Sequence, residues 1–553
     1  DLKCVIINNC KKNKNNEYVL FCNNESEIRD SDAVLISDEK GPVHGECIEA
    51  YVKTVSKNSI TISTRVEINE GTFKPKYLDK HDSETVFERN FAAAYQLLDS
   101  AELKGLKDII LGTRAPISNR PKKISKVSGS AEYQIQDNAV RIASGIEDFL
   151  LIKGPPGTGK TVTVAKIIEQ LVNEDKKVIV SCYTHRAVNE VIKKVKEYSP
   201  DIVIYKIGSR LEEEDGVKVL EKEIKKEGDI DSQIKSANTI IDSCPVYIGT
   251  THAWLSGRFD NLILRNEDNS FDIAIIDEAS QVILPSILGV VRLAKKFILV
   301  GDEKQLPPVI QSELAKGLEE TLFEKLYNDY YENKDVENVT VMLNNQHRMA
   351  EPIANFISHE FYDGHLNTAE NCKNQQLRIE LNKSELKNII DPNKPMTLVH
   401  TETSAIVAKD RTSPHEVKII TDILTDLIKC GVSAKNIGII APYRAQVAEM
   451  RRSIELNLHE EFESSFQGSR IVDTVDRFQG DERDIILFSL CLLRKDIPRV
   501  LQDTRRINVA ISRAKLKFIG VGNWNLVENS KVLSSLINYV RNNEGCSFVN
   551  WEK

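Results

Sequence analysis

The stretch FLLIKGPPGTGKTVTVAKIIEQLV, residues 149–172, decides the fold of this chain. It begins with a short apolar run, passes through a loop rich in glycine and proline, and continues with apolar residues at helical spacing. The loop, residues 154–161, matches the pattern G-x-x-x-x-G-K-[ST] in full, and it lies between a strand and a helix as that pattern requires. The stretch therefore predicts a phosphate-binding loop at the end of a buried parallel strand.

Each part of this loop has a physical role in holding phosphates. The glycines allow backbone N–H groups to curl around an anion, and the helix that follows presents its positive N-terminus. Lys160 is expected to reach the β- and γ-phosphates of ATP, and the Thr161 hydroxyl is expected to ligate Mg²⁺. The expected nucleotide-binding residues of the loop are Gly154, Pro155, Pro156, Gly157, Thr158, Gly159, Lys160 and Thr161. The alternative is a Gly/Pro turn without a ligand.

Two further strand ends carry polar residues that suit phosphate chemistry. In FDIAIIDEAS, residues 271–280, Asp277 can hold Mg²⁺ through its water shell and Glu278 can act as base for an attacking water. In GDEKQLPP, residues 301–308, Gln305 can orient water or contact the γ-phosphate. The alternatives are acidic residues that merely end a strand and a glutamine that caps a turn.

Short apolar runs alternate with helical stretches from residue 147 onward, which is typical of parallel sheets flanked by helices. The first series of expected strands is DFLLIK, KVIVSC, PVYIGT, FDIAIID, KFILVGD and VTVML. The second series is MTLVHT, NIGIIAP, RIVDTV, DIILFSL and KFIGVG. Two such series predict two α/β domains with a cleft between them.

The N-terminal part of the chain follows a different pattern. Residues 1–70 alternate short β-rich runs with turns, which predicts a small antiparallel barrel, either an accessory domain or a purely structural one. Residues 77–113 have helical spacing, and the Pro-, Ser- and Lys-rich stretch after residue 114 is expected to be a linker. The charged segment at about 208–240 is expected to form a helical insert. The expected domains are 1–70, 71–128 (stalk and linker), 129–345 and 346–553.

Composition sets broad limits on the class of protein. The 553 residues are 41% apolar and 28% charged, with a net charge of −8, which argues against a histone-like basic protein but allows a local basic groove for nucleic acid. No apolar run is long enough for a membrane span, so we expect no membrane partner. The first residue is Asp and not Met, so the start looks trimmed.

The ten cysteines form no CxxC pair, which favours reduced thiols in an intracellular protein, cytoplasmic, or nuclear if eukaryotic. Cys4, Cys10 and Cys22 are close in sequence and leave a metal site open as an alternative.

Taken in order, these motifs resemble those of superfamily 1 helicases. The wording DEAS followed by GDEKQLPP is similar to the branch containing the nonsense-mediated-decay helicase and the helicase half of the replication nuclease-helicase. The resemblance spans residues 130–525 and implies two tandem RecA-like domains behind the small β-barrel and helical stalk. It also implies that ATP and Mg²⁺ are used.

The resemblance carries further residues over, motif by motif. QDNAV places Gln136 on the adenine edge, and TVDRFQGDERD places Gly480 near the phosphates and Glu482 on the ribose. RRINVAISRAK aims Arg513 at the γ-phosphate, although Ser512 stands where the family often has Thr. The expected contacts to the nucleic-acid strand, from SCYTHRAVNE, IGTTHA, APYRAQ and TVDRF, are Thr184, His185, Thr250, Thr251, Pro442, Tyr443, Arg444 and Thr474.

The segment QHRM, residues 346–349, departs from the QYRM of the family. The resemblance implies that Arg348 reaches the phosphates as an arginine finger. It places His347 where the family has a tyrosine that stacks on the base. A smaller imidazole predicts weaker stacking and looser nucleotide choice.

The resemblance implies an ATP-dependent helicase that moves 5′→3′ as a monomer on single-stranded nucleic acid, with DNA slightly favoured over RNA. In that mechanism ATP closes the cleft between the two α/β domains and hydrolysis reopens it. The barrel is then expected over the strand exit or the duplex fork. Two alternatives stay open: an ATP-gated clamp or scaffold that binds nucleic acid without unwinding, and the motor half of a larger nuclease, although these residues carry no paired-carboxylate nuclease signature.

Overall fold

The structure, a computed structural model, divides into two compact units, Asp1–Ala92 and Ala93–Lys553. It describes residues 5–13, 16–22, 28, 33–41, 45–56, 58–64, 66–69, 71, 73–80, 84–99, 103–124, 130–207, 217–220, 244–255, 271–310, 313–331, 333, 335–402, 411–457, 471–492 and 497–552.

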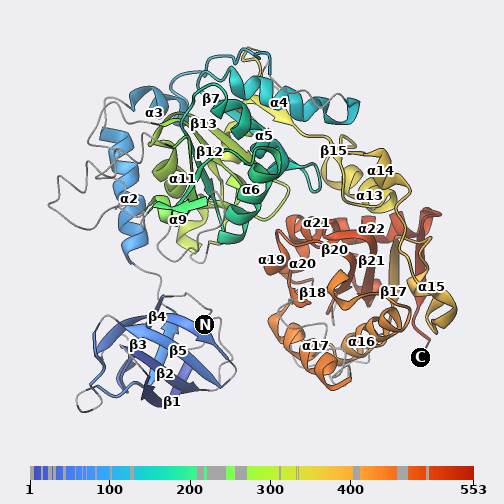
Figure 1. The fold of residues 1–553 in the computed structure, drawn as a ribbon. Coiled ribbons are helices and arrows are strands. Elements are labelled where there is room, and N and C mark those ends of the chain that lie inside the picture. Colours follow the sequence, from blue (N-terminus) through green and yellow to red (C-terminus); the bar gives the residue numbers. More distant parts are fainter. Residues whose placement is uncertain are drawn as a thin grey trace. The chain divides into compact units, whose positions relative to one another are not determined.

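The first unit contains a closed antiparallel barrel (Figure 1). Its strands, in barrel order, are β1 (Val5–Lys12), β2 (Glu17–Cys22), β5 (Ser59–Thr64), β4 (Cys47–Val55), β3 (Ala33–Ser37) and β6 (Tyr77–Lys80). Alternate residues fill the interior, as Ile60 and Ile62 of β5 do. The barrel expected from the period-2 pattern is confirmed.

The expectation of a helix beginning at residue 77 was wrong. Residues Tyr77–Lys80 form β6, which pairs with both β1 and β3 and so closes the barrel. Helical spacing over four residues carries little information, and the two open strand edges require a partner. The expected helices follow as α2 (Glu84–Asp99) and α3 (Lys104–Ile110).

The second unit contains an eight-stranded parallel sheet. In order its strands are β10 (Val217–Val219), β9 (Ile204–Ile207), β11 (Val246–Thr250), β8 (Val178–Cys182), β12 (Phe271–Ile276), β13 (Ala294–Gly301), β7 (Phe149–Lys153) and β14 (Thr340–Met342). This strand order places β7, which leads into the phosphate loop, beside β13 and close to β12, which lead into the two acidic segments. All six strands expected here are present. Since the strands are parallel, their carboxyl ends share one edge of the sheet.

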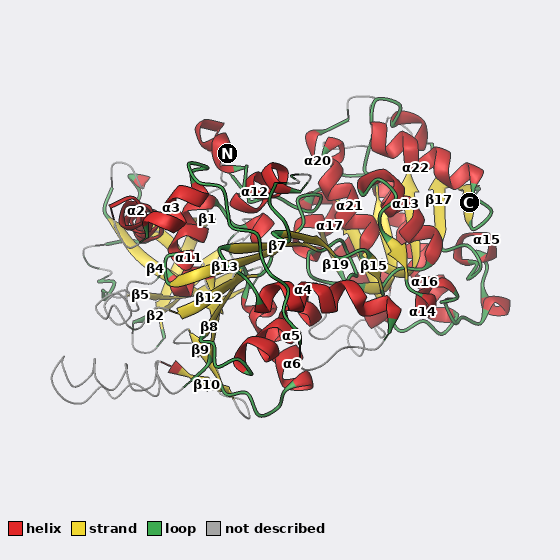
Figure 2. Ribbon diagram, turned by 90° about the horizontal axis from the view of Figure 1, so that it is seen from above, coloured by secondary structure: helices red, strands yellow, loops and turns green. Residues whose placement is uncertain are grey.

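Helices cover both faces of this sheet (Figure 2). One face packs against α4 (Gln134–Ser144), α5 (Lys160–Val172) and α6 (His185–Tyr198). The other packs against α3, α9 (Thr251–Trp254), α11 (Leu284–Val291) and α12 (Leu322–Tyr330). This is the layered α/β arrangement that the sequence predicts.

Two segments differ from the sequence-based expectations. Within the insert expected to be helical, Val217–Val219 forms the edge strand β10 with both valines buried; most of the remaining insert lies outside the described residues. Residues 115–124, expected to be a linker, instead form an extended segment, called the strap below, that packs on the first α/β part. Its backbone N–H groups donate to the carbonyls of Arg141, Gly145 and Glu337. Asn119 is buried there and donates to the carbonyls of Phe149 and Asn338, which a Pro- and Ser-rich composition does not foretell.

The second α/β part is a six-stranded parallel sheet. In order its strands are β19 (Val472–Thr474), β18 (Ile437–Ala441), β20 (Arg483–Ser489), β21 (Ala514–Gly522), β17 (Met396–His400) and β22 (Cys546–Asn550). The helices that pack on its two faces are α13 (Glu351–Phe361), α21 (Thr504–Ser512) and α22 (Lys531–Asn542) on one, and α16 (Pro414–Lys429) and α17 (Arg444–Asn457) on the other. The five expected strands are confirmed, and β22 was not expected. A small pair, β15 (Asn345–Gln346) with β16 (Asn367–Thr368), lies between the two sheets in sequence.

Two findings bear on location and metals. Among the described residues, no helix has the length and apolar character needed to cross a bilayer. No group of three or more His, Cys, Asp or Glu side chains within the described part of the chain is arranged for a metal ion, and Cys4 lies outside that part.

Candidate functional site

The phosphate loop connects β7 to α5 and is shaped by its glycines. Gly157 and Gly159 have φ of +77° and +78°, in the left-handed region that favours glycine. A Cβ on Gly154 would lie 2.1 Å from Cγ of Lys160, and a Cβ on Gly157 would lie 2.7 Å from Cβ of Arg348. Lys160 Nζ donates to the carbonyl of Gly154 at 2.8 Å, which holds the ammonium over the loop.

Asp277 and Glu278 follow β12 next to this loop. Burial and the charge of neighbouring Glu278 together raise the pKa of Asp277 to about 7, although Lys160 opposes the shift. Glu278 adopts a left-handed φ of +54°, a strained conformation for a residue with a side chain. Its Oε1 lies 3.9 Å from Nζ of Lys160, and its Oε2 accepts from Gln281 at 2.8 Å. The pair expected from the sequence therefore faces the phosphate loop.

Gln305 lies in the turn after β13, and its side chain links two parts of the site. Its Nε2 donates to Asp302 Oδ2 at 2.7 Å, and its Oε1 accepts from Arg513 Nη2 at 3.4 Å. One end of the side chain therefore braces the turn, and the other contacts the guanidinium of Arg513.

Arg348 reaches the site from the segment that follows β14. The backbone N–H of His347 donates to the Gly157 carbonyl at 2.8 Å, so this segment packs on the phosphate loop. The Arg348 side chain forms an ion pair with Glu482, with Nε 2.6 Å from Oε2, and Lys515 lies 2.7 Å from the other carboxylate oxygen. Although burial opposes the shift, these two cations lower the pKa of Glu482 to about 2.

Arg513 directly follows α21 and is 3% exposed. Its Nε donates to the carbonyl of Val509 at 3.1 Å, and Nη1 donates to that of Asp481 at 3.3 Å. Burial and the charge of Arg348 lower the pKa of Arg513 to about 9. Two guanidinium groups thus converge beside the phosphate loop, where an anion would relieve their desolvation and mutual repulsion.

Tyr133, which no sequence motif predicts as a site residue, contacts His347 and precedes Gln136 by three residues. The Gln136 Nε2 donates to the carbonyl of Thr158 at 3.3 Å, and its buried Oε1 has no hydrogen-bond partner among the described residues. The His347 ring stacks on Tyr133 with centroids 5.0 Å apart and planes 7° from parallel. Burial lowers the pKa of His347, so the imidazole is neutral at physiological pH. The only sequence signal for Tyr133 is an aromatic residue three positions before Gln136.

These residues fit a nucleotide with its magnesium ion. The unpartnered Gln136 Oε1 can accept from an exocyclic amino group, and the two left-handed glycines leave a cradle that a Cβ would fill. Asp277 is buried with a raised pKa, and a bound cation would lower it again. Thr161 is the second residue of α5, in the first turn of the helix that follows the loop. Gly480 has φ +81° and open space around it, which agrees with a close backbone approach.

The strand contacts expected in the first sheet lie at the ends of two paired strands. Thr250 ends β11 and pairs with Cys182, the last residue of β8; Thr184 and His185 follow β8. Thr184 is exposed, and its hydroxyl caps α6. Thr251 is 3% exposed and bonds to Ser181 and Cys182, so its hydroxyl is turned inward and offers little to a strand.

The contacts expected in the second sheet are arranged in the same way. Ala441, which ends β18, pairs with Thr474, which ends β19, so the 442–444 loop and Thr474 lie at adjacent strand ends. Arg444 is exposed and Tyr443 half-buried, whereas Pro442 is buried and shapes the loop.

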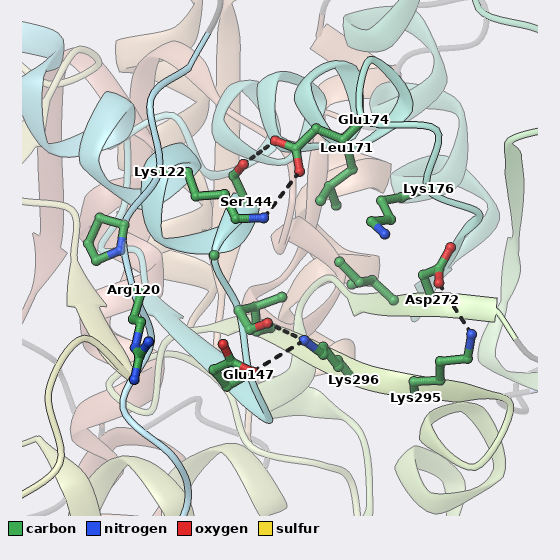
Figure 3. Close-up of a pocket in the computed structure, with 14 residues that line it drawn as sticks. Arg120, Lys122, Ser144, Glu147, Leu171, Glu174, Lys176, Asp272, Lys295 and Lys296 are labelled. Carbon is green, nitrogen blue, oxygen red and sulfur yellow. Dashed lines mark hydrogen bonds and ion pairs between the residues drawn. The ribbon is translucent and has the colours of Figure 1, made fainter.

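A cavity of about 350 Å³ lies elsewhere on the first α/β part (Figure 3). Its lining includes Arg120, Glu147, Lys176, Asp272 and Lys296, which come from the strap and from the amino ends of the strands. The phosphate loop is at the carboxyl ends of the same strands. The cavity is therefore separate from the nucleotide site.

Comparison with known proteins agrees with this geometry. Two family models, each described as an AAA domain, match residues 133–219 with 208–313 and residues 318–525. A solved arterivirus nonstructural protein 10 helicase is 11% identical and covers 94% of this chain and 78% of its own, at a TM-score of 0.40, too low to establish a shared fold.

The similar curated proteins include nuclease-helicases and an archaeal helicase. The DNA replication ATP-dependent helicase/nuclease DNA2 of Saccharomyces cerevisiae is 28% identical over 78% of this chain and 29% of its own length, and the Homo sapiens protein is 26% identical over 89% and 47%. The uncharacterized ATP-dependent helicase MJ0104 of Methanocaldococcus jannaschii is 28% identical over 94% of this chain and 87% of its own length. The chain thus spans about a third to a half of the nuclease-helicases it matches.

Proposed function

We propose that this chain, which belongs to the superfamily 1 helicases, is an ATP-dependent helicase that moves 5′→3′ along single-stranded nucleic acid. Within that superfamily it belongs to the branch containing the nonsense-mediated-decay helicase and the helicase half of the replication nuclease-helicase. The observation that carries this proposal is the convergence of Arg348 and Arg513 on the phosphate loop. A buried guanidinium, that of Arg513, beside the half-buried guanidinium of Arg348, which is paired with Glu482, suits a polyphosphate.

In this proposal the chain supplies charge and position for transfer of the γ-phosphoryl group to water. Lys160 neutralises the β- and γ-phosphates, and Glu278 accepts the proton of the attacking water. Mg²⁺, held by Thr161 and Asp277, would supply further positive charge at the phosphates. Arg348 and Arg513 complete the site when the cleft closes, and arginines used in this way contribute on the order of 10³–10⁵ in rate.

Adenine recognition is assigned to Gln136 and His347, and ribose binding to Glu482. Support for the first comes from the free buried acceptor of Gln136 beside the loop. For Glu482 the proposal requires that nucleotide binding loosen its ion pair with Arg348. That exchange would release the arginine toward the phosphates.

Strand binding is assigned to residues at paired strand ends. Thr184 and His185, which are exposed, would hold one stretch of backbone together with Thr250, which is buried and whose hydroxyl accepts from the Ala253 N–H. Tyr443, Arg444 and Thr474 would hold the next stretch; Arg444 is exposed and the other two are half-buried. Thr251 and Pro442 are buried, so they would contribute by fixing the conformation of the loops that carry the strand contacts. Backbone contacts give little sequence preference, so DNA is preferred over RNA in this proposal only because relatives are named for DNA replication.

We retain the predicted domains 1–70, 71–128, 129–345 and 346–553, a monomeric state and an intracellular location as parts of the proposal. The described cysteines are free thiols, which supports a reducing compartment.

The motor half of a longer nuclease-helicase is a second candidate. The observation in its favour is that relatives named helicase/nuclease extend well beyond the matched region. Metal-dependent cleavage by the full product of the native gene, absent from the present 553 residues, would support it. A full product without cleavage would exclude it.

ATP hydrolysis with and without single-stranded DNA tests the proposed function. We expect strand-stimulated hydrolysis that Lys160→Ala abolishes, while the control Lys176→Ala, in the turn at the other end of α5, leaves it intact. Strand binding with no hydrolysis in the wild type would instead identify an ATP-gated clamp. Hydrolysis that survives Lys160→Ala would refute the assignment of this site.

A further inference from the structure

The buried hydroxyl of Tyr362 joins three segments that are far apart in the sequence. Tyr362 directly follows α13. Its side chain is 2% exposed and belongs to the hydrophobic core of the second α/β part. Its hydroxyl donates to Asp302 Oδ2 at 2.7 Å and accepts from Asn508 Nδ2 at 2.9 Å. Asp302 follows β13 of the first sheet, and Asn508 lies within α21 of the second α/β part.

Both partners of this hydroxyl form further hydrogen bonds with residues of the candidate site and the turn beside it. Asp302 also accepts from Gln305 Nε2 and, at 3.1 Å, from the backbone N–H of Lys304; its own N–H donates to Ser280 Oγ at 3.1 Å. Asn508 Nδ2 donates in addition to the Lys304 carbonyl at 2.8 Å. Two hydrogen bonds from one amide therefore hold α21 against the 302–305 turn, one directly and one through Tyr362.

The position of Arg513 depends on this attachment. Arg513 directly follows α21, the helix that carries Asn508, and lies about one and a half helical turns after Asn508. The hydrogen bond from Arg513 to Gln305 is 3.4 Å long. That length is at the weak end of hydrogen bonding. At the other end of the linkage, Ser280 lies two residues after Glu278. The linkage thus runs from the segment of the proposed base to the helix of the proposed arginine finger.

The direction of the central hydrogen bond follows from its partners. Asn508 Nδ2 can only donate to the Tyr362 hydroxyl, so the hydroxyl directs its own proton to Asp302. Burial and the nearby Asp302 also raise the pKa of the Tyr362 hydroxyl well above its ordinary value, so the phenol keeps this proton. A phenylalanine would fill the same space and leave Asp302 with one donor fewer.

We propose that Tyr362 is a positioning residue whose hydroxyl couples the 302–305 turn to α21, so that strand binding and ATP hydrolysis act on one another through it. This inference rests on the proposed function. Tyr362 contacts neither phosphate nor strand; it sets where Arg513 lies relative to Gln305 and Glu278. Losing the hydroxyl leaves the phosphate loop untouched and loosens only the second α/β part against the first.

The test compares Tyr362→Phe with Tyr539→Phe. The control removes the hydroxyl of a half-buried tyrosine that donates to the carbonyl of Pro352 at 2.8 Å, at the other end of α13 and away from the 302–305 turn. For Tyr362→Phe we expect a fluorescent ATP analogue to bind within about twofold of wild type, and strand-stimulated kcat to fall by about tenfold, the factor that about 1.4 kcal/mol represents. For Tyr539→Phe we expect both to stay at wild-type values.

A purely structural role predicts a different pattern. It would lower the melting temperature and reduce basal and strand-stimulated hydrolysis by the same factor in Tyr362→Phe, which would overturn the inference. Unchanged stimulation in Tyr362→Phe would overturn it as well, while leaving the proposed function intact. A wild type without any strand stimulation would instead refute the proposed function itself.

A second variant keeps the test decisive should Tyr362→Phe fold poorly. Asn508→Ala removes the other side of the same linkage, so we expect the same loss of stimulation. We also expect the double variant to lose no more than the stronger single one, because residues in one network are not additive. Fully additive losses would contradict the linkage.

Discussion

Replacing Gly157 by alanine would separate the phosphate loop from the segment that carries Arg348. Gly157 has φ +77°, and the new Cβ would lie 2.7 Å from Arg348 Cβ and 3.4 Å from its backbone nitrogen. Carbon atoms pack at about 3.5–4.0 Å, so the two segments must part by roughly 1 Å. The left-handed backbone adds about 1–2 kcal/mol of strain.

The consequence for hydrolysis follows from that displacement. The hydrogen bond from His347 N–H to the Gly157 carbonyl, now 2.8 Å, would lengthen, and Arg348 would move away from the phosphates. A misplacement of about 1 Å can cost on the order of 10²-fold in rate. We therefore expect strand-stimulated kcat to fall by about 10- to 100-fold in Gly157→Ala.

Gly431→Ala provides the matched control. Gly431 has φ +89°, and its nearest neighbour to a new Cβ would be Glu380 Oε1 at 3.9 Å, so it carries the backbone strain without the clash. Urea unfolding should show a loss of about 1–2 kcal/mol in both variants, with hydrolysis impaired only in Gly157→Ala. Equal kcat values in the two variants would refute the reasoning that this contact positions Arg348.

Three further predictions concern single side chains. His347→Tyr should tighten ATP binding by about 0.5–1.5 kcal/mol in calorimetry, since a larger ring stacks better; unchanged affinity would mean that this side chain does not meet the base. Arg348→Ala should lower kcat by about 10³-fold or more while KM for ATP changes far less, and a kcat within threefold of wild type would exclude a finger role. Burial raises the pKa of Glu416 from 4.5 to about 7. At pH values between these two, the carboxyl of Glu416 is therefore protonated in the folded chain and ionised in the unfolded chain. Wild-type stability should therefore fall as pH rises from about 4.5 to about 7, and urea unfolding of Glu416→Gln should show a flatter profile; parallel profiles would contradict this.

Local sequence patterns predicted the elements whose residues carry their own signal. The phosphate loop, the carboxylates after β12 and the apolar runs of both sheets are each defined within about ten neighbouring residues. Their convergence followed from a general rule, because parallel strands end at one edge. Hence the first sheet places Asp277 and Glu278 beside the loop.

Contacts between distant residues could not be predicted in the same way. The strand β6 exists because β1 and β3 need a partner, and the strap holds its place through Asn119, whose partners include a carbonyl 219 residues away. Stacking of Tyr133 on His347 and the ion pair of Arg348 with Glu482 also join distant segments. Nothing in a short window of sequence records such pairings.

Unwinding of short DNA duplexes that carry either a 5′ or a 3′ single-stranded tail tests whether this chain is a 5′→3′ helicase. We expect ATP-dependent separation of the 5′-tailed duplex, little separation of the 3′-tailed one, and none of either with Lys160→Ala. Separation only from 3′ tails would contradict the proposed polarity. Absence of ATP-dependent separation from both, in protein that hydrolyses ATP, would contradict the assignment as a helicase.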